Sequence, residues 1–255
     1  MAETAGSLQR LARQLVEGGT ARGITLRLLG SIAVRERCAG RTDIFLRLDR
    51  EPPIDIDLVG YLKQQGLIML MFKELGYRID PTIAQSQEWG IQRLIYYAPE
   101  SGVKVDVFLD VLRMSHTIDF KNRLEGRAMT VAPVDLLLAK LQVFRITEKD
   151  LKDIVAILLV HGLGGSGDEI DVPYLLRRLR EDWGFYYTAS RNLTLVESWL
   201  ETQHGLDPDD VSTMWSRLSA IRSRIQSEPK SLRWRMRAAI GPRLPWYEEV
   251  GEVER

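Results

Sequence analysis

Two aspartates alternate with large aliphatic residues in the segment Ile54-Asp-Ile-Asp-Leu58. In a β-strand, successive side chains face opposite sides, so Asp55 and Asp57 share one face, ~7 Å apart. Two carboxylates placed in this way suit a divalent cation, and Mg²⁺ prefers such hard oxygen ligands. Because 35 of the 255 residues are acidic, acid-x-acid pairs also arise by chance. A solvated edge strand is therefore the alternative interpretation of the pair.

A third acid, Asp106, is centred in the apolar segment Val103–Asp110, where it shares one face with Lys104, Phe108 and Asp110. A carboxylate inside an apolar strand is costly unless it is paired or bound to a metal. Three carboxylates on two strands would suit two-metal phosphoryl chemistry.

A glycine and a serine, Gly30-Ser31, separate an apolar segment from the start of an expected helix. A strand that turns into a helix in this way exposes backbone N–H groups at the helix N-terminus, which favours binding of a phosphate. An ordinary strand-to-helix turn is the alternative, because Gly-Ser pairs are common.

The elements that must position these residues alternate between strands and helices in the first half of the chain. Pro53 ends a polar stretch from Ala39, which we expect to be mostly loop with a short strand at 44–48. Gly18-Gly19 is expected to end the first helix, and Arg93 lies on a predicted strand but is not part of the predicted site. The expected strands are 24–29, 54–59, 91–97, 103–111 and 128–131, and the expected helices are 7–17, 32–38 and 62–75.

The second half is expected to be helical. Pro133 suits the first turn of a helix, and Thr147 with Asp150 forms the pattern of a capping box at the start of the next. Further helices are expected near 172–180, 189–203, 208–226 and 231–240. The sequence thus predicts an α+β fold, in which a small mixed sheet with flanking helices (1–131) precedes an all-helical C-terminal half (132–255).

The order of the motifs resembles the nucleotidyltransferase superfamily that includes DNA polymerase beta. The matching segments are Leu29-Gly30-Ser31, Asp55-Ile56-Asp57 and Val105-Asp106-Val107. The resemblance implies a nucleotidyltransferase fold and an enzyme of EC 2.7.7 type, which moves a nucleoside monophosphate from a nucleoside triphosphate to a hydroxyl acceptor. It implies that Asp55, Asp57 and Asp106 are catalytic and hold two Mg²⁺ ions, with Mn²⁺ as a substitute. Gly30, Ser31 and Lys140 are the implied nucleotide-binding residues.

The helical half resembles bacterial AbiEii-type nucleotidyltransferase proteins, through Pro133–Lys140 and through Arg145, Lys149, Asp150 and Asp153. The likeness covers roughly residues 24–160 and implies a toxin-like enzyme with an RNA or tRNA acceptor and an antitoxin partner. One departure is the long gap between Gly30 and Asp55, which contains the arginine-rich stretch 35–50.

The charge pattern bears on the acceptor. The 35 basic and 35 acidic residues balance, which argues against a wholly basic nucleic-acid coat. Residues 217–243 nevertheless contain eight basic side chains, with Trp234 among them and Trp215 two positions before them, and could bind RNA. The alternatives are a solvated helix face, a small-molecule acceptor of the aminoglycoside type, and a catalytically silent nucleotide- or RNA-binding module.

The location is expected to be cytoplasmic. The single cysteine, Cys38, allows no intrachain disulfide, and the N-terminal residues lack the order of a signal peptide. The apolar runs are far shorter than a membrane span, so we expect no membrane association. The three histidines lack the spacing of zinc ligands.

Overall fold

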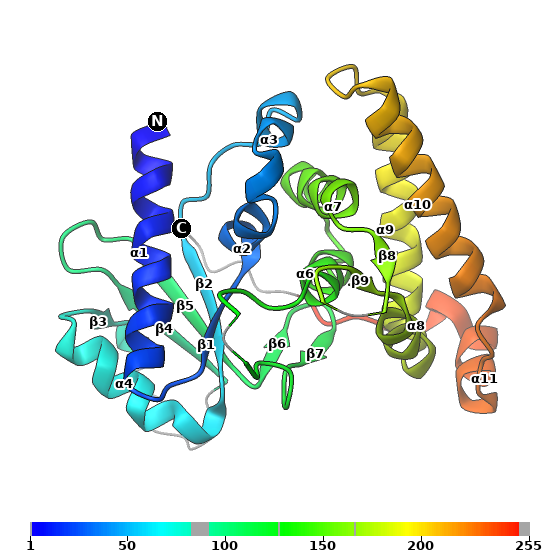
Figure 1. Ribbon diagram of the computed structural model, residues 1–255. Helices are drawn as coiled ribbons and strands as arrows, with labels where there is room; N and C mark the ends of the chain where they lie inside the picture. Colours follow the sequence, from blue (N-terminus) through cyan, green and yellow to red (C-terminus); the bar gives the residue numbers. More distant parts are fainter. Residues whose placement is uncertain (1, 83–91, 127, 166, 250–255) are drawn as a thin grey trace. The chain divides into compact units, whose positions relative to one another are not determined.

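The computed structural model describes residues 2–82, 92–126, 128–165 and 167–249 (Figure 1). The chain forms two compact units. The first comprises residues 1–36, 51–112 and 118–131, and the second comprises residues 37–50, 113–117 and 132–255. The chain therefore changes unit at the expected boundary after residue 131, but two earlier segments also belong to the second unit. That 1–131 and 132–255 are separate domains stays a prediction.

The first unit is built on a five-stranded mixed sheet with the strand order β1-β2-β5-β4-β3. The central pair, β2 and β5, is parallel, and the remaining neighbours are antiparallel. The predicted small mixed sheet is confirmed, although the two-residue strand β3 was not expected. The strands are β1 (Leu26–Leu29), β2 (Ile56–Gly60), β3 (Arg78–Ile79), β4 (Arg93–Tyr97) and β5 (Lys104–Leu109).

One face of this sheet is covered by the helices α1 (Ala2–Ala21) and α4 (Gln65–Glu74), as Figure 1 shows. The side chain of Leu26 lies against Gly19 of α1 and against Gly60 of β2, and Gly60 in turn approaches Ile68 of α4. Gly60 shares its face with Ile56 and Leu58 of β2, so these two apolar side chains point toward the helices. Asp57, which has the opposite parity, belongs to the other face.

Two local predictions for the first fifty residues are wrong. The first helix does not stop at Gly18-Gly19 but continues to Ala21. The predicted strand at 44–48 is a helix, α3 (Asp43–Arg47), in which Asp43 and Arg47 form an i,i+4 ion pair of 2.9 Å. Its buried side chains are the neighbours Ile44 and Phe45, while Leu46 is exposed, so the strand alternation that the apolar run suggested is absent.

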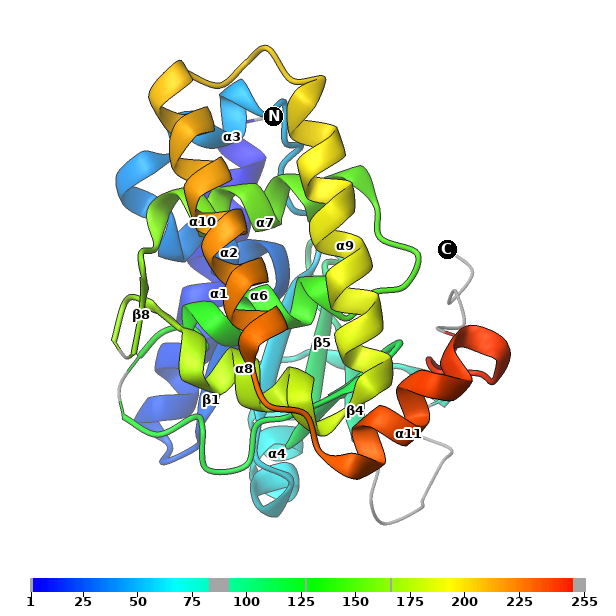
Figure 2. The same ribbon diagram turned by 90° about the vertical axis from the view of Figure 1, so that its right-hand side faces the viewer.

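The second unit is mainly helical. Figure 2 shows α9 and α10 running side by side along it. The predicted capping box is confirmed, because Thr147 N–H donates to Asp150 and the Asp150 N–H donates to the Thr147 hydroxyl. Besides α3, its helices are α6 (Pro133–Leu141), α7 (Glu148–Val160), α8 (Val172–Glu181), α9 (Trp183–Glu201), α10 (Pro208–Ser227) and α11 (Leu232–Ile240).

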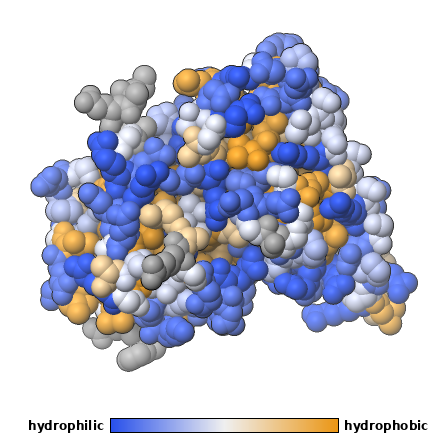
Figure 3. Space-filling model, in the orientation of Figure 1, coloured by the Kyte–Doolittle hydropathy of each residue, from blue (hydrophilic) through white to orange (hydrophobic). Residues whose placement is uncertain are grey.

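Short strands also occur outside the main sheet. β6 (Val111–Arg113) pairs with β7 (Thr117–Asp119), and β8 (Leu163–Gly164) pairs with β9 (Ile170–Asp171). The predicted strand at 128–131 is reduced to a single bridge between Thr130 and Leu28. Figure 3 shows a mainly hydrophilic surface with separate apolar patches. Among the described residues, no helix combines the length and the apolar character that crossing a membrane requires.

Candidate active site

Strand register brings two of the predicted acids together. β2 and β5 run parallel, and Asp57 is the register partner of Asp106. Neighbouring strands lie about 4.8 Å apart, so the two side chains emerge next to each other on the same face of the sheet. The carboxylates at 57 and 106 are therefore neighbours, although 49 positions separate them in the sequence.

The Gly30-Ser31 turn lies directly against Asp57. Leu29 is the register partner of Asp57 in the antiparallel pair β1–β2, and Gly30 begins the helix α2 (Gly30–Arg37). Gly30 has φ +65°, and a Cβ built on it would clash with Oδ2 of Asp57. Both the left-handed backbone and the adjacent carboxylate therefore require glycine here.

The first turn of α2 is the feature of this corner of the sheet that suits an anion. The first N–H groups of a helix lack partners within the helix, and they carry the positive end of its dipole. Ser31, the second residue of α2, is half-buried. An anionic group beside Asp57 would thus meet both the carboxylate and these N–H groups.

Asp55 precedes the first residue of β2 and is half-buried. Across residues 2–82, 92–126, 128–165 and 167–249, no three acidic, histidine or cysteine side chains form a group that could hold a metal ion. The neighbouring carboxylates of Asp57 and Asp106 have the donor chemistry of a Mg²⁺ site, since one or two carboxylates together with substrate phosphates commonly hold this ion. Metal binding by Asp55, Asp57 and Asp106 stays a prediction.

Asp106 has two cationic partners that the sequence interpretation did not include in the site. Its side chain is 3% exposed, and its two oxygens are contacted by Arg93 and by Lys104. Lys104 could have been recognised from the sequence, because it lies two residues before Asp106 on the same strand and hence on the same face. Arg93 could not, since its position depends on the pairing of β4 with β5.

Asp110, which the alternating pattern placed on the same face as Asp106, has a different role. It lies beyond the end of β5 with φ +62°, and its Oδ1 accepts a hydrogen bond of 3.1 Å from the N–H of Leu62. It therefore stabilises the connection after β2 rather than the carboxylate pair.

Lys140, a predicted nucleotide-binding residue, contacts two carboxylates of the second unit. Its Nζ lies 2.8 Å from Asp150 and 2.9 Å from Asp153, and Asp153 also pairs with Arg50 at 2.8 Å. Burial alone would lower the pKa of Lys140, but the two carboxylates outweigh burial and the pKa is raised. Lys140 is therefore a charged member of a largely buried ion-pair network.

The arginine-rich stretch 35–50, which lies in the long gap between Gly30 and Asp55, is largely engaged in contacts within the protein. Arg41 pairs with Asp210, Arg47 pairs with Asp207 and Asp43, and Arg37 pairs with Asp168. Arg35 donates to the carbonyl oxygen of Glu51. These contacts anchor the stretch and offset much of its positive charge.

The basic segment 217–243 is divided between internal contacts and exposure. Arg222 pairs with Glu197, and Arg237 lies over the ring of Trp183 at 4.4 Å while donating to backbone carbonyls. Trp234 packs edge-on against Tyr186, 4.9 Å between ring centroids, so it is not a free stacking platform. The exposed basic side chains of the segment are Arg224, Arg233, Arg235 and Arg243.

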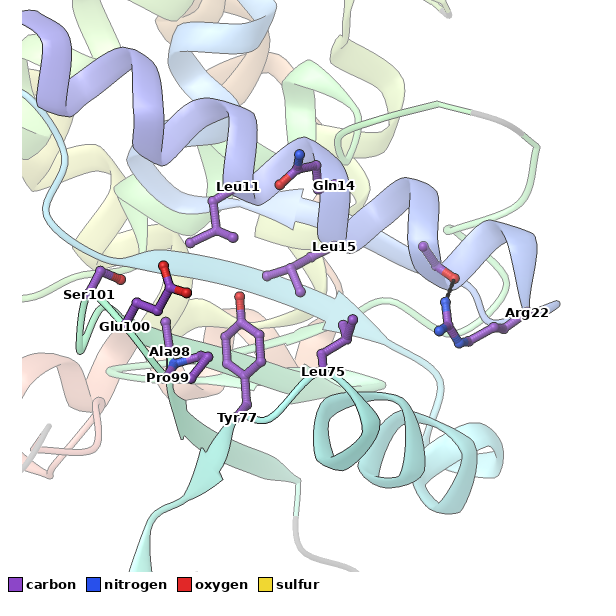
Figure 4. A pocket seen from close by; sticks show the side chains of 11 residues that line it. Leu11, Gln14, Leu15, Arg22, Leu75, Tyr77, Ala98, Pro99, Glu100 and Ser101 are labelled. Atoms are coloured by element: carbon purple, nitrogen blue, oxygen red, sulfur yellow. Dashed lines mark hydrogen bonds between the residues drawn. The ribbon is translucent and has the colours of Figure 1, made fainter.

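A pocket of about 340 Å³ lies on the helix-covered side of the sheet (Figure 4). Leu11 and Leu15 of α1 form one wall, and the turn Ala98–Ser101 forms another. Figure 4 shows the Tyr77 hydroxyl pointing between Leu15 and Glu100. None of the predicted site residues lines this pocket, so it is separate from the carboxylate pair.

Comparisons with known proteins identify solved structures but no family model and no curated protein that match the sequence. A lincomycin-bound lincosamide antibiotic adenylyltransferase, LnuA, is 15% identical with a TM-score of 0.38, over 56% of this chain and 90% of the other. The antibiotic-resistance factor ANT(2'')-Ia is 12% identical with a TM-score of 0.36, over 87% and 95%. An antigenic nucleotidyltransferase-like protein from Paracoccidioides brasiliensis is 13% identical with a TM-score of 0.38, over 72% and 92%. Because all three TM-scores are below 0.5, the case for a function rests on the contacts within the chain itself.

Proposed function

We propose that the protein is a nucleotidyltransferase, which moves a nucleoside monophosphate from a nucleoside triphosphate to a hydroxyl group of an acceptor. The observation that carries the proposal is the contact of the Gly30 turn with the Asp57 carboxylate, next to Asp106 on the parallel neighbouring strand. Nucleotide transfer needs an anion-binding turn and metal-binding carboxylates close together, because the triphosphate and its cation bind as one unit.

The proposed roles follow from these positions. The N–H groups at the start of α2, with Ser31, hold the triphosphate. Asp55, Asp57 and Asp106 would hold Mg²⁺, or Mn²⁺ in its place. When bound, the metal neutralises phosphate charge and lowers the pKa of an acceptor hydroxyl. Asp106 would also act as the general base that takes the proton of the acceptor hydroxyl.

RNA, with tRNA as the first candidate, is the acceptor that we propose. The support is the set of exposed arginines at 224, 233, 235 and 243, which can contact phosphates. A small hydroxylated molecule as acceptor and a catalytically silent binding module are the outcomes against which this proposal is tested. An antitoxin partner and a cytoplasmic location remain predictions from the sequence.

Nucleotide transfer tests the proposal directly. The protein is incubated with Mg²⁺, each α-labelled nucleoside triphosphate in turn, and either total RNA or a panel of aminoglycosides. We expect label on RNA that disappears with Asp57→Ala, while that variant keeps its fold because Asp57 is only half-buried. The matched control is Glu100→Gln, which removes an exposed carboxylate beside the pocket on the helix-covered side.

Each outcome has a distinct meaning. Label on an aminoglycoside would replace RNA by a small-molecule acceptor. Full activity of Asp57→Ala would refute the assignment of the site. Binding of the triphosphate without any transfer would favour the silent module, and failure to bind it would refute the role of the Gly30-Ser31 turn.

A further inference from the structure

Both oxygens of the Asp106 carboxylate already have cationic partners. Oδ1 accepts from Nε of Arg93 at 3.0 Å and lies 3.0 Å from its Nη2, while Oδ2 lies 2.9 Å from Nζ of Lys104. Such charge-assisted contacts are about twice as strong as neutral hydrogen bonds. The carboxylate that should take part in metal binding is thus occupied by side chains of the protein itself.

The backbone fixes these partners at Asp106. Lys104 is on the same strand and the same face, and Arg93 reaches across from β4, where its register partner is Phe108. The Arg93 guanidinium lies over the Phe108 ring at 5.3 Å, which holds it in place. The two cations differ from Asp106 in exposure, because Lys104 and Arg93 are 30% and 39% exposed. Their charged groups can therefore move into water without breaking the sheet.

A divalent cation on the same carboxylate oxygens would conflict with these partners. Mg²⁺ binds carboxylate oxygens at ~2.1 Å. An ammonium or guanidinium on the same oxygen would then lie about 4–5 Å from the ion and repel it. The metal and the pair of side chains are therefore competitors for Asp106.

We propose that Arg93 and Lys104 are resident counter-ions of Asp106, which a divalent cation must displace when it enters the site. The inference rests on the proposed function and adds a control of metal loading to it. While the pair is in place, it offsets the repulsion between the neighbouring carboxylates Asp57 and Asp106. Once displaced, the two cations remain beside the site, where the phosphates that arrive with the metal can bind them.

Metal affinity without nucleotide tests this inference by a measurement other than activity. Bound and free Mn²⁺ are measured by electron paramagnetic resonance during titration of the wild-type protein, Lys104→Met, Arg93→Met and the double variant. Removing a competitor should tighten Mn²⁺ binding by roughly tenfold for each single variant and by more for the double variant. A residue with a merely structural role would leave the affinity unchanged or weaken it.

Three controls make the titration decisive. Lys73→Met removes an exposed cation from α4, on the other face of the sheet, and should change the affinity less than twofold. Lys104→Arg keeps the charge and should retain the wild-type affinity. Circular dichroism checks folding, and where a methionine variant fails to fold, Lys104→Gln or Arg93→Gln is titrated in its place.

The result also separates this inference from the proposed function. Unchanged or weaker Mn²⁺ binding by folded Lys104 and Arg93 variants overturns the inference, even if the wild-type protein transfers label. If no variant binds Mn²⁺ and the wild-type protein transfers no label, the proposed function and the inference both fail. Tighter binding that disappears when Asp106→Asn is added supports the inference.

Discussion

The two units each contain a nearly buried aspartate with two cationic partners, and the two clusters differ in the exposure of those partners. Asp106 in the first unit pairs with Arg93 and Lys104, which are substantially exposed. Asp153 in the second unit is 2% exposed and pairs with Arg50 and Lys140, which are 6% and 15% exposed. The cations that pair with Asp106 can thus turn into solvent, whereas the cations that pair with Asp153 are held inside the protein.

This difference separates a structural ion pair from one that can take part in a reaction. A fully buried pair cannot be opened without leaving an uncompensated charge in a poorly polar environment. A pair with exposed cations costs little to open, because water solvates the released side chains. The comparison predicts that removing Asp153 destabilises the fold far more than removing Asp106.

The largest expected effect is the loss of stability in Asp153→Asn. It leaves Arg50 and Lys140 buried without their shared carboxylate, which should lower the free energy of unfolding by about 3–5 kcal/mol. Urea denaturation followed by circular dichroism measures this difference. A decrease in the free energy of unfolding of less than about 1 kcal/mol would mean that the ion pairs of Asp153 contribute little to stability.

A second prediction concerns pH and His116, one of the buried histidines of the second unit. His116 bonds to the Thr188 hydroxyl at 2.8 Å and stacks on Phe185. Burial lowers the pKa of His116 to about 4, against a smaller opposing effect of Asp182. Since the unfolded chain takes up the proton near pH 6.5, the free energy of unfolding should fall as the pH drops from about 6.5 to about 4, by roughly 3 kcal/mol in total.

Urea unfolding of His116→Gln at several pH values checks this origin. The variant should lose the part of the pH dependence that His116 causes, whereas His204→Gln, at an exposed histidine, should keep it. Equal pH dependence in both variants would assign the effect to other groups.

Gly30→Ala extends the comparison to the backbone of the first unit. Because residue 30 has a left-handed φ of +65°, alanine at this position should lower the free energy of unfolding by about 1–2 kcal/mol. The new methyl group should also displace the Asp57 carboxylate. Gly23→Ala is the matched control, because Gly23 has φ +71° and no atom within 4 Å of the added Cβ. Transfer activity should fall in Gly30→Ala alone; equal activity in both variants would contradict the contact with Asp57.

The smallest expected effect completes the comparison of the two aspartates. Asp106→Asn should lower the free energy of unfolding by only about 1 kcal/mol, because Arg93 and Lys104 can turn toward solvent. It should nevertheless reduce transfer activity strongly. A loss of stability equal to that of Asp153→Asn, measured in the same urea experiment, would remove the distinction between the clusters.

The sequence predicts well what depends on local pattern. The alternation around Asp57 and Asp106 correctly indicated the two central strands, and the spacing of Thr147 and Asp150 predicted the capping box. The pattern failed at Ile44–Leu48, where apolar neighbours suggested a strand and an ion-paired helical turn formed instead. Periodicity carries little information over so few residues.

What the sequence could not supply is pairing between distant segments. That Asp57 lies beside Asp106 follows from the register of β2 and β5, and that Arg93 reaches Asp106 follows from the pairing of β4 and β5. The contact of Arg50 with Asp153 joins residues 103 positions apart. The ion pairs of Lys140 with Asp150 and Asp153 are likewise contacts that the sequence did not predict, and nucleotide binding by Lys140 stays a prediction.

The interruption of the first unit by residues 37–50 has a consequence for the order of folding. This segment is made early during synthesis, but its partners Asp153, Asp207 and Asp210 are made more than a hundred residues later. Ile44 and Phe45 therefore lack their final contacts until the later part of the chain has been synthesised. Contacts of such high sequence separation slow folding. We therefore expect that chaperones can bind the nascent chain, and proteases can cleave it, until the second unit has been synthesised.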